Sequence, residues 1–433
     1  MLGQWWMTFD DSLATQLVRE ALTNNYTVQI AATNVAAARA QARIVGVATW
    51  PQSSATGSGS RSKRNFIGFP IPGAGGQVQS TTSTSFAADV AVSWELDLWG
   101  RLRSSHSAAL ADLQAIEADW HGVRQSLAAQ TMRAYFACVE AQRQVHLSEA
   151  TVESYETSTR QVQSRYERGL RPALDLHLAR ASLSSAEASL YQRRLQLDMS
   201  VRQLEVLVGR YPAGVLQPGS RLPTIQQPVP AGLPAELIGR RPDLAAVERR
   251  LAASDSRVRE ARRALYPRIS LTAVGGRSSN ALADLLDGDF SVWNLVGNLT
   301  QPLFQAGRLR AGIDLSEANA DRAVIAYAQT ALRAFAEVES GLAAEGLLAE
   351  QEVALTAASQ ESTHARIVAR QRYAKGLTDM LTMLISQRTA FDAESRLLAV
   401  QRQRLDTRID LHLALGGGFA HDGDALSTAG DTP

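Results

Sequence analysis

The side chains best suited to recognition in this 433-residue chain lie in two short arginine–tyrosine segments. Arg165-Tyr166-Glu167-Arg168-Gly169-Leu170 and Arg372-Tyr373-Ala374-Lys375-Gly376-Leu377 share the pattern Arg-Tyr-x-x-Gly-Leu. A guanidinium is a planar fork of donors that fits a carboxylate or the carbonyls of a helix end, and tyrosine adds a hydroxyl on an aromatic ring. Glycine permits a chain reversal between helices. The pattern predicts contacts made at a turn, or, as the simpler alternative, residues that only cap and pack that turn.

Patterns for catalysis or metal binding are absent from the sequence. The seven histidines are scattered, with no Cys/His cluster at metal-ligand spacing. No Gly-x-Ser-x-Gly elbow or P-loop opens a helix after a strand. The single cysteine, Cys138, cannot form a disulfide within the chain, and we expect a buried, inert thiol. With a net charge of +1 there is no basic surplus for nucleic acid. We therefore expect no enzyme activity, cofactor or metal, and no nucleic-acid partner.

The two arginine–tyrosine segments belong to an internal duplication. They lie 207 residues apart, and the same interval separates Gly100-Arg101-Leu102-Arg103 from Gly307-Arg308-Leu309-Arg310 and Gly209 from Gly416. More than a hundred residues therefore run through both halves with no net insertion or deletion. The spacing predicts two copies of one long structural unit.

Long helices are predicted on both sides of each turn. Proline costs about 3 kcal/mol in a helix interior, and only Pro172 occurs between Arg101 and Gly209. No proline occurs from Leu303 to Thr432. The apolar residues follow a coiled-coil spacing of 3 and 4, as in Leu113, Ile116, Trp120, Val123 and Leu127. We expect helices over 101–168 and 308–375, each with an antiparallel partner, over 173–208 and up to Leu415.

A shorter helix and a pair of strands precede each long hairpin. The helices are expected over 17–48 and 233–264, closed by Trp50-Pro51 and Tyr266-Pro267. Residues 85–98 alternate without a break between apolar and more polar side chains, which indicates a strand with two different faces. Shorter alternations occur at 269–273 and 293–300, and the strand after Pro51 has the weakest pattern. Residues 61–79 and 280–289 are expected to be loops.

The predicted sheet has two interpretations. It could pack on a soluble core, or its apolar face could meet lipid in a membrane barrel, since strands of about 9–11 residues cross a bilayer. Trp94, Trp99, Trp293 and Phe304 would suit the interfacial girdles of such a barrel. Four strands cannot close a barrel, and hydrocarbon does not tolerate an open edge. The membrane interpretation therefore requires several copies of the chain.

The N-terminal residues of the sequence carry no visible export signal. Residues 1–9 lack a basic stretch followed by an apolar one, and no run of about 18 apolar residues occurs. Composition, at 45% hydrophobic and 20% charged, fits neither a disordered chain nor a bundle of membrane helices. Either the chain is cytosolic or a signal has been removed from this version of the sequence.

Several motifs in one order resemble a known family. They are Trp5-Trp6, the Trp-Pro and Tyr-Pro strand entries, Glu95-Leu96-Asp97-Leu98-Trp99-Gly100-Arg101, Gln301-Pro302-Leu303-Phe304-Gln305-Ala306-Gly307-Arg308 and the paired Arg-Tyr-x-x-Gly-Leu turns. From about Trp5 to Gly416 the chain resembles the outer-membrane factor (TolC-like) family, in particular the branch serving resistance-nodulation-division efflux pumps.

The resemblance implies a mixed α and β membrane protein that is internally duplicated. Long helical hairpins would form a periplasmic α-barrel, and four strands per chain would contribute to a trimeric twelve-strand β-barrel in outer-membrane lipid. The implied domains are a first repeat over 1–209 (β-hairpin 52–99, helical hairpin 101–209), a Pro-rich equatorial linker over 210–232, a second repeat over 233–416 (β-hairpin 268–305, helical hairpin 308–415) and a flexible tail over 417–433. The implied partners are two sister subunits, a periplasmic adaptor and an inner-membrane resistance-nodulation-division transporter.

The resemblance also assigns roles to the turn residues. The periplasmic aperture and the adaptor-docking surface would contain Arg165, Tyr166, Gly169, Leu170, Asp175, Arg372, Tyr373, Gly376, Leu377 and Asp379. Asp379 is a candidate for an acidic ring at the constriction, and Asp175 follows the first turn. Ile385 and Ser386 stand a little beyond Asp379, where some relatives carry an aspartate, which puts the acidic ring in doubt. Many members of this branch are lipoproteins, and since no N-terminal cysteine is present, an acyl anchor is an expectation about residues missing from this version.

Two further alternatives stay open at this point. A protein of the same fold could be the outer-membrane duct of a type I protein secretion system, although Trp5-Trp6 and the tip turns favour small-molecule export. A soluble coiled-coil scaffold would explain the helices but not the alternating strands. Six methionines form no obvious relay for a soft metal.

Overall fold

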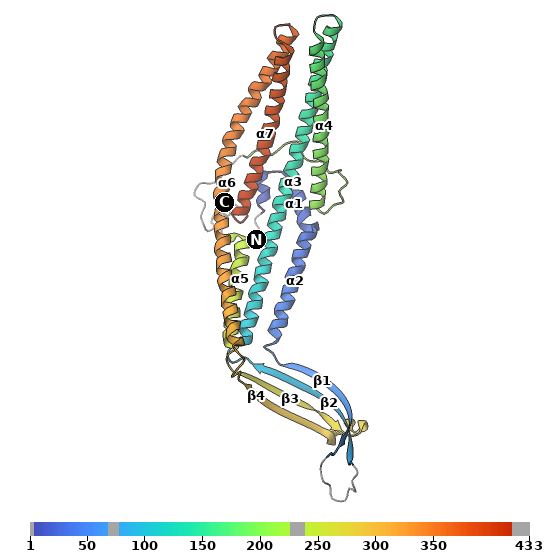
Figure 1. Cartoon of the computed structure of the whole chain (residues 1–433), viewed down its shortest axis with the longest axis vertical. Coiled ribbons are helices and arrows are strands. Elements are labelled where there is room, and N and C mark those ends of the chain that lie inside the picture. The colour runs from blue at the N-terminus through green and yellow to red at the C-terminus, as the bar shows by residue number, and fades with distance from the viewer. Residues whose placement is uncertain (1–3, 68–77, 226–238, 418–433) are drawn as a thin grey trace, which may run out of the picture. The chain divides into compact units, whose positions relative to one another are not determined.

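The computed structural model describes residues 4–67, 78–225 and 239–417, and it contains long helices and one antiparallel sheet (Figure 1). The elements follow in the order η1 (Trp5–Phe9), α1 (Ser12–Asn24), α2 (Tyr26–Val47), β1 (Gln52–Asn65), β2 (Ser80–Leu96), α3 (Arg101–Glu167), α4 (Ala173–Leu207), α5 (Pro242–Arg263), β3 (Arg268–Ser279), η3 (Leu282–Leu286), η4 (Gly288–Phe290), β4 (Ser291–Thr300), α6 (Arg308–Ala374) and α7 (Met380–Ala414). Here η denotes a 3-10 helix.

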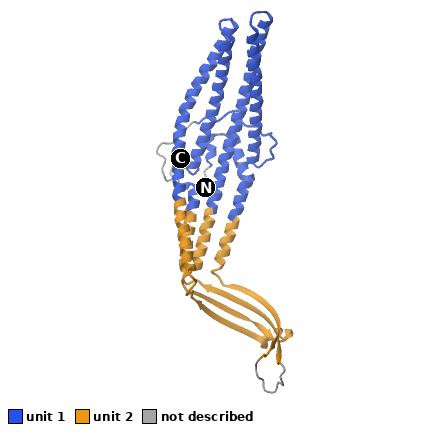
Figure 2. Cartoon of the chain, viewed as in Figure 1, with its two compact units in different colours: residues 1–35, 116–247, 327–433 blue, residues 36–115, 248–326 orange. Residues whose placement is uncertain are grey.

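The chain divides into two compact units, each drawing on both predicted repeats (Figure 2). The first unit comprises residues 1–35, 116–247 and 327–433, and it holds both hairpin turns. The second unit comprises residues 36–115 and 248–326, and it holds the sheet. The proposed domain boundaries at 209, 232 and 416 stay a prediction.

The helical hairpins occur in duplicate, with matched lengths. α3 and α6 have 67 residues each, and α4 and α7 have 35 residues each. All four helices end at a glycine with φ between +74° and +80°: Gly169, Gly209, Gly376 and Gly416. A left-handed residue at that position lets the following N–H groups reach back to the last helical carbonyls. The duplicated hairpins predicted from the spacing are therefore confirmed.

The main core of the first unit joins the N-terminal segment to three long helices. Trp5, Trp6 and Phe9 are buried against α1, α3, α4 and α7, and the Trp5 ring stacks on His412 with centroids 5.3 Å apart. Cys138 is fully buried in this core, as expected. Burial raises the pKa of its thiol to about 11, so the thiol stays protonated and unreactive at neutral pH.

The sheet of the second unit has the strand order β1-β2-β3-β4, with every pair antiparallel. Residues directly opposite each other in such pairs share one face. One face of the sheet therefore carries Phe86, Val90 and Trp94 of β2 and the β3 residues opposite them. On β4 the same face carries Leu295 and Leu299. We call this the apolar face. The polar face carries Ser85, Asp89, Ser93 and Glu95 of β2 together with Asn294, Asn298 and Thr300 of β4.

The predicted helix over 17–48 was wrong, because it is two helices. The chain is extended at Asn25 (φ −68°, ψ 129°) between α1 and α2. The Asn25 carboxamide accepts a hydrogen bond from the Thr27 N–H at 2.8 Å and donates one to the Leu207 carbonyl at 2.8 Å. The second contact involves a residue 182 positions away, which local periodicity does not reveal.

Two predicted loops were also wrong in part. β1 continues through Asn65 and β2 begins at Ser80, so part of the expected loop over 61–79 is strand. The segment 280–289 contains the 3-10 helices η3 and η4 instead of irregular chain. α5 begins at Pro242, and residues 233–238 of the helix expected there lie outside the described residues, as do 226–232 of the linker and 418–433 of the tail.

Candidate functional site

The two hairpin turns have the same backbone geometry. The Leu170 N–H donates to the Arg165 carbonyl at 2.9 Å, and the Leu377 N–H donates to the Arg372 carbonyl at the same distance. Gly169 has φ +74° and Gly376 has φ +79°. Leu170 and Leu377 are 67% and 63% exposed, so each turn presents an uncovered leucine at its apex.

Arg165 of the first turn binds the end of the helix that leads to the second turn. Its guanidinium donates through Nη1 to the Tyr373 carbonyl at 3.0 Å and through Nη2 to the Ala374 carbonyl at 2.6 Å. The last carbonyls of a helix have no N–H partner within the helix and carry its partial negative charge. Arg165 thus joins two hairpins through one of the two acceptor types expected of it.

Tyr373 fills the space beneath this contact. It is 1% exposed and packs in a cluster with Val162, Leu176 and Met383. The Arg171 and Arg165 guanidinium carbons lie 4.9 Å and 5.5 Å from the centre of its ring. Burial raises the pKa of the Tyr373 hydroxyl. Two cations over a buried ring form a cation–π arrangement that holds the first turn on the second.

The counterparts of this arginine and tyrosine, Arg372 of the second turn and Tyr166 of the first turn, are exposed. Tyr166 is 42% exposed. Arg372 is exposed, and within the described part of the chain its side chain has no hydrogen bond or ion pair. The contact from Arg165 to Tyr373 is therefore not repeated from Arg372 to Tyr166 within one chain.

The two acidic candidates already have partners. Asp379 is the N-cap of α7, where its carboxylate accepts the Thr382 N–H at 2.6 Å, and this hydrogen bond lowers its pKa. Asp175 lies in the first turn of α4, with its Oδ2 3.9 Å from Nη1 of Arg171. Ile385 is 49% exposed on α7. A capping carboxylate keeps its charge but is fixed in direction, so Asp379 also has a local structural role at the start of α7.

Sequence reasoning missed two contributors to this region. Arg171 covers the Tyr373 ring from the first turn. Gln387 is fully buried, and its amide nitrogen donates to Ser154 at 3.2 Å and to Ser158 at 3.0 Å. The available signal was a polar residue within the spacing Met380, Leu384, Gln387, Phe391, which places an amide on the otherwise apolar face of α7.

The aromatic residues predicted for the membrane interfaces lie in the second unit. Trp94 donates its indole N–H to the Thr49 carbonyl at 3.1 Å, and Trp99 donates to the Pro267 carbonyl at 2.8 Å. These bonds fix both rings at the end of the sheet next to the helices. Trp293 and Phe304 are 84% and 88% exposed, and Trp293 stands opposite Gly275, closer to the other end of the sheet.

The described residues contain no group of three histidine, cysteine or acidic side chains that could hold a metal ion. None of the helices in that part of the chain combines the length and the hydropathy needed to cross a bilayer.

Comparison with known proteins decides the family. A family model described as "Outer membrane efflux protein" matches residues 17–210 and 233–417. The chain belongs to the outer membrane efflux protein family. This efflux protein is 34% identical to the probable efflux pump outer membrane protein TtgC of Pseudomonas putida, over 96% of this chain and 85% of the relative. It is 35% identical to the outer membrane protein OprJ of Pseudomonas aeruginosa, over 96% of this chain and 86% of the relative.

Solved structures resemble this efflux protein along nearly its whole length. The outer-membrane channel OprN superposes with a TM-score of 0.89 at 29% identity, covering 96% of this chain and 93% of OprN. The CmeC channel of Campylobacter jejuni gives a TM-score of 0.91 at 25% identity, covering 99% and 92%. The predicted fold class, outer-membrane location and trimeric assembly with adaptor and transporter partners are confirmed for this efflux protein as a family member. The family consists of channel components, so the soluble-scaffold alternative is set aside.

Proposed function

We propose that this outer-membrane channel exports small organic toxicants, antibiotics or solvents, and catalyses no reaction itself. The observation that supports the substrate class is similarity along nearly the whole chain to proteins named for such cargo. These include the antibiotic efflux pump outer membrane protein ArpC, at 34% identity, and the solvent efflux pump outer membrane protein SrpC, at 33%, both of Pseudomonas putida. An inner-membrane transporter and a periplasmic adaptor would deliver the cargo.

A complementation assay tests the export function. The protein, directed to the outer membrane, is expressed in a strain that lacks its own outer-membrane efflux channel but keeps the pump and adaptor. We expect restored resistance to a dye, an antibiotic and toluene. Purified protein should be a trimer that conducts ions in a planar bilayer. Monodisperse protein without detergent, or a conducting trimer that restores resistance to none of these compounds, contradicts the proposal.

We also propose that the two tips form the periplasmic aperture and dock the adaptor. The supporting observation is the asymmetry between them. Arg165 contacts the helix end at Tyr373, whereas Arg372 makes no such contact to Tyr166 within the described residues. Because the hairpins are copies of one unit, a ring of three chains alternates first and second tips. Arg372 would then donate to the helix end at Tyr166 of the next subunit, as Arg165 does within the chain. The same arginine–carbonyl contact, made once within each chain and once between neighbouring chains, would then hold the aperture closed.

Arginine substitutions test the aperture role. Arg165→Ala and Arg372→Ala should each raise single-channel conductance or open probability, and the double substitution should raise it further. Arg168→Ala is the matched control, since Arg168 is an exposed arginine of the first turn with no hydrogen bond or ion pair within the described residues. Unchanged conductance and unchanged efflux in Arg165→Ala, in Arg372→Ala and in the double variant would exclude the aperture role.

Leucine substitutions test the docking role separately. Leu170→Glu and Leu377→Glu replace the exposed apex leucines with charges and leave the arginine contacts in place. We expect the adaptor to be lost in co-purification and efflux to fall, with bilayer conductance unchanged. Retained co-purification of the adaptor with both variants would show that the apices are not the docking surface.

A further inference from the structure

The β1–β2 hairpin carries two cations on its apolar face, at the end far from the helices. Gly59 stands opposite Phe86, Arg61 opposite Thr84, and Lys63 opposite Thr82. Opposite residues of an antiparallel pair share a face, and a face repeats every second residue. Arg61 and Lys63 therefore continue the face of Phe86, Val90 and Trp94, which is the face that meets lipid in a membrane barrel.

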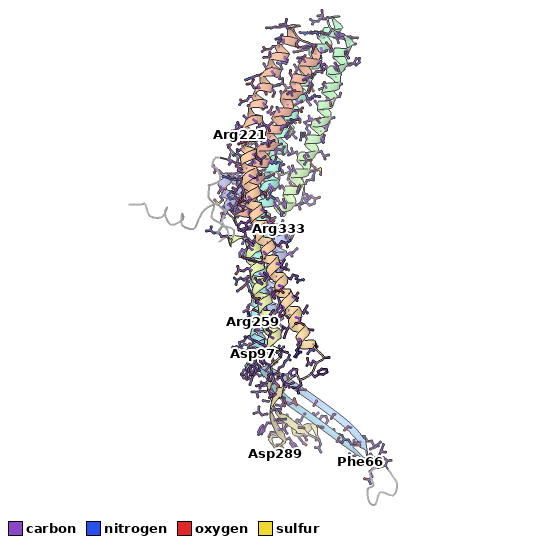
Figure 3. The ribbon with its side chains drawn as sticks, turned by 60° about the vertical axis from the view of Figure 1, so that its left-hand side comes forward. Phe66, Asp97, Arg221, Arg259, Asp289 and Arg333 are labelled. Carbon is purple, nitrogen blue, oxygen red and sulfur yellow. The ribbon has the colours of Figure 1, made fainter. Side chains whose placement is uncertain are left out.

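Their height along the sheet can be estimated from the register. Arg61 is level with Thr84, ten residues from Trp94. At about 3.3 Å per residue and a tilt of about 40°, this separation corresponds to roughly 25 Å across the membrane. That is about the height of the apolar band of an outer-membrane barrel. Figure 3 shows Phe66, next to the end of β1, at one end of the hairpin and Asp97 at the other, beside the helices. With Trp94 at the periplasmic interface, Arg61 and Lys63 reach the opposite, outer interface.

Neither cation is neutralised by the protein in the part of the chain that the structure describes. β1 is exposed throughout, and neither side chain has a hydrogen bond or ion pair with a described residue. Asp89 and Glu95, the acidic residues of β2, lie on the polar face. A third cation on the apolar face, Arg277, differs, because its Nη1 donates to the Leu285 carbonyl at 3.0 Å. A lipid-facing charge is costly at the bilayer midplane and nearly free at the interface, so the two cations fit the outer interface, where the phosphate groups of lipids are available to pair with them.

We propose that Arg61 and Lys63 bind the phosphate groups of an anionic lipid in the outer leaflet of the outer membrane. A guanidinium can bind a phosphate through two parallel hydrogen bonds, and an ammonium adds a mobile point charge. The two residues lie two positions apart on one face, about 7 Å along the strand. The hydroxyls of Thr82 and Thr84, directly opposite them, offer further donors. The site rests on the outer-membrane location of the protein and is independent of the role proposed for the tips.

The opposite face of the same strand provides a matched control. Arg64 stands opposite Thr81, on the polar face. Arg61→Gln and Arg64→Gln each remove one guanidinium from β1, and only the first removes it from the lipid-facing side. The Arg61→Gln/Lys63→Gln double variant removes both cations of the proposed site.

Lipid titration of the detergent-solubilised trimer, followed by native mass spectrometry, tests the proposal. The probes are diphosphoryl lipid A, the same lipid without phosphates, and inorganic phosphate. We expect the unmodified trimer to prefer the diphosphoryl lipid. Arg61→Gln should weaken its binding about tenfold, the usual scale for one charged hydrogen-bonded contact. The double variant should weaken it further, and Arg64→Gln should leave it within about twofold of the unmodified protein.

Three outcomes overturn the proposal. Equal binding of the lipid with and without phosphates shows that only the acyl chains are recognised. Equal losses for Arg61→Gln and Arg64→Gln show that net charge matters and the face does not. Displacement of the lipid by an equal concentration of inorganic phosphate shows a site for a free anion. The same spectra report the mass of the trimer. If Arg61→Gln fails to assemble, Lys63→Gln and the comparison of the two lipids on the unmodified protein test the proposal in its place.

Discussion

The two hairpin tips have the same sequence pattern and the same turn, yet their tyrosines have opposite surroundings. Tyr373 is 1% exposed beneath two arginines, whereas Tyr166 is 42% exposed. Arg165 donates to two carbonyls of the neighbouring helix, and Arg372 has no such acceptor within the described residues. The repeated residues therefore specify the chain reversal twice, while their contacts depend on which hairpin lies alongside. Among the described residues of one chain, the contact from Arg165 is present and its equivalent from Arg372 is not.

The tyrosines give the largest expected difference between the tips. Tyr373→Ala should cost about 3–5 kcal/mol of stability, because it removes a fully buried aromatic ring. Tyr166→Ala should cost less than about 0.5 kcal/mol in the isolated chain, because its ring is half exposed. Thermal unfolding followed by circular dichroism measures both.

Assembly sharpens this comparison. If Tyr166 is covered by Arg372 of the next subunit, Tyr166→Ala should also lower the dissociation temperature of the trimer. Equal destabilisation by the two substitutions at the level of the single chain would contradict the asymmetry described above.

The turn glycines should respond equally, since their backbone conformations match. Gly169→Ala and Gly376→Ala each place a side chain at a positive φ, which costs about 1–2 kcal/mol. A Cβ at either position would meet no atom within 4 Å, so the cost is conformational and no steric clash adds to it. Similar shifts in the denaturation midpoint are expected. Gly346→Ala, inside α6 with open space around its Cβ, should instead raise stability by a few tenths of a kcal/mol to about 1 kcal/mol.

The helix caps after the turns give the smallest difference, and it depends on pH. Asp379 caps α7 with its carboxylate, whereas Pro172 precedes α4 and makes no side-chain cap. Because the hydrogen bond to the Thr382 N–H lowers the pKa of Asp379 in the folded protein, its contribution is present above the ordinary pKa of 3.8 and is lost as the pH falls through the folded-state pKa.

Substitution at this cap isolates the effect. Asp379→Ala should slightly lower the unfolding temperature at pH 7, and the loss should shrink as the pH falls below 3.8. Asp379→Asn keeps a capping oxygen and should show a smaller loss with no such pH dependence. A loss that grows on acidification would show that Asp379 does not act as a cap.

Much of the fold was predictable because it depends on local periodicity. The matched intervals located both hairpins, and the alternation over 85–98 gave β2 with its two faces. The errors came where a distant partner decides the local structure. Asn25 interrupts a continuous helical pattern because its carboxamide binds Leu207. Arg61, Lys63 and the serine-rich residues before them form a strand because the backbone of β2 lies alongside, although their own side chains favour a loop.

The candidate site was predictable in position but not in its contacts. Asp97 illustrates the same limit at the start of α3, where its carboxylate accepts the N–H groups of Leu102 at 3.0 Å and Arg103 at 2.8 Å. The second repeat has Phe304 at the equivalent place, and a phenylalanine side chain has no oxygen to accept these hydrogen bonds. The motif that carries the family resemblance in the first repeat therefore also caps a helix, and its copy in the second repeat does not.

The sequence by itself determined the duplication, the helical and strand periods, the chain reversals at Gly169 and Gly376 and the family, because these depend on residue order and on each residue's own conformational preferences. Only the tertiary structure decided that Tyr373 is covered and Tyr166 is not, that Asp379 is used as a cap, and that Arg61 and Lys63 share the apolar face. The burial of a side chain, its hydrogen-bond partner and its strand register all depend on contacts between segments that are distant in the sequence. Identical residues therefore differ in these properties when different segments pack beside them.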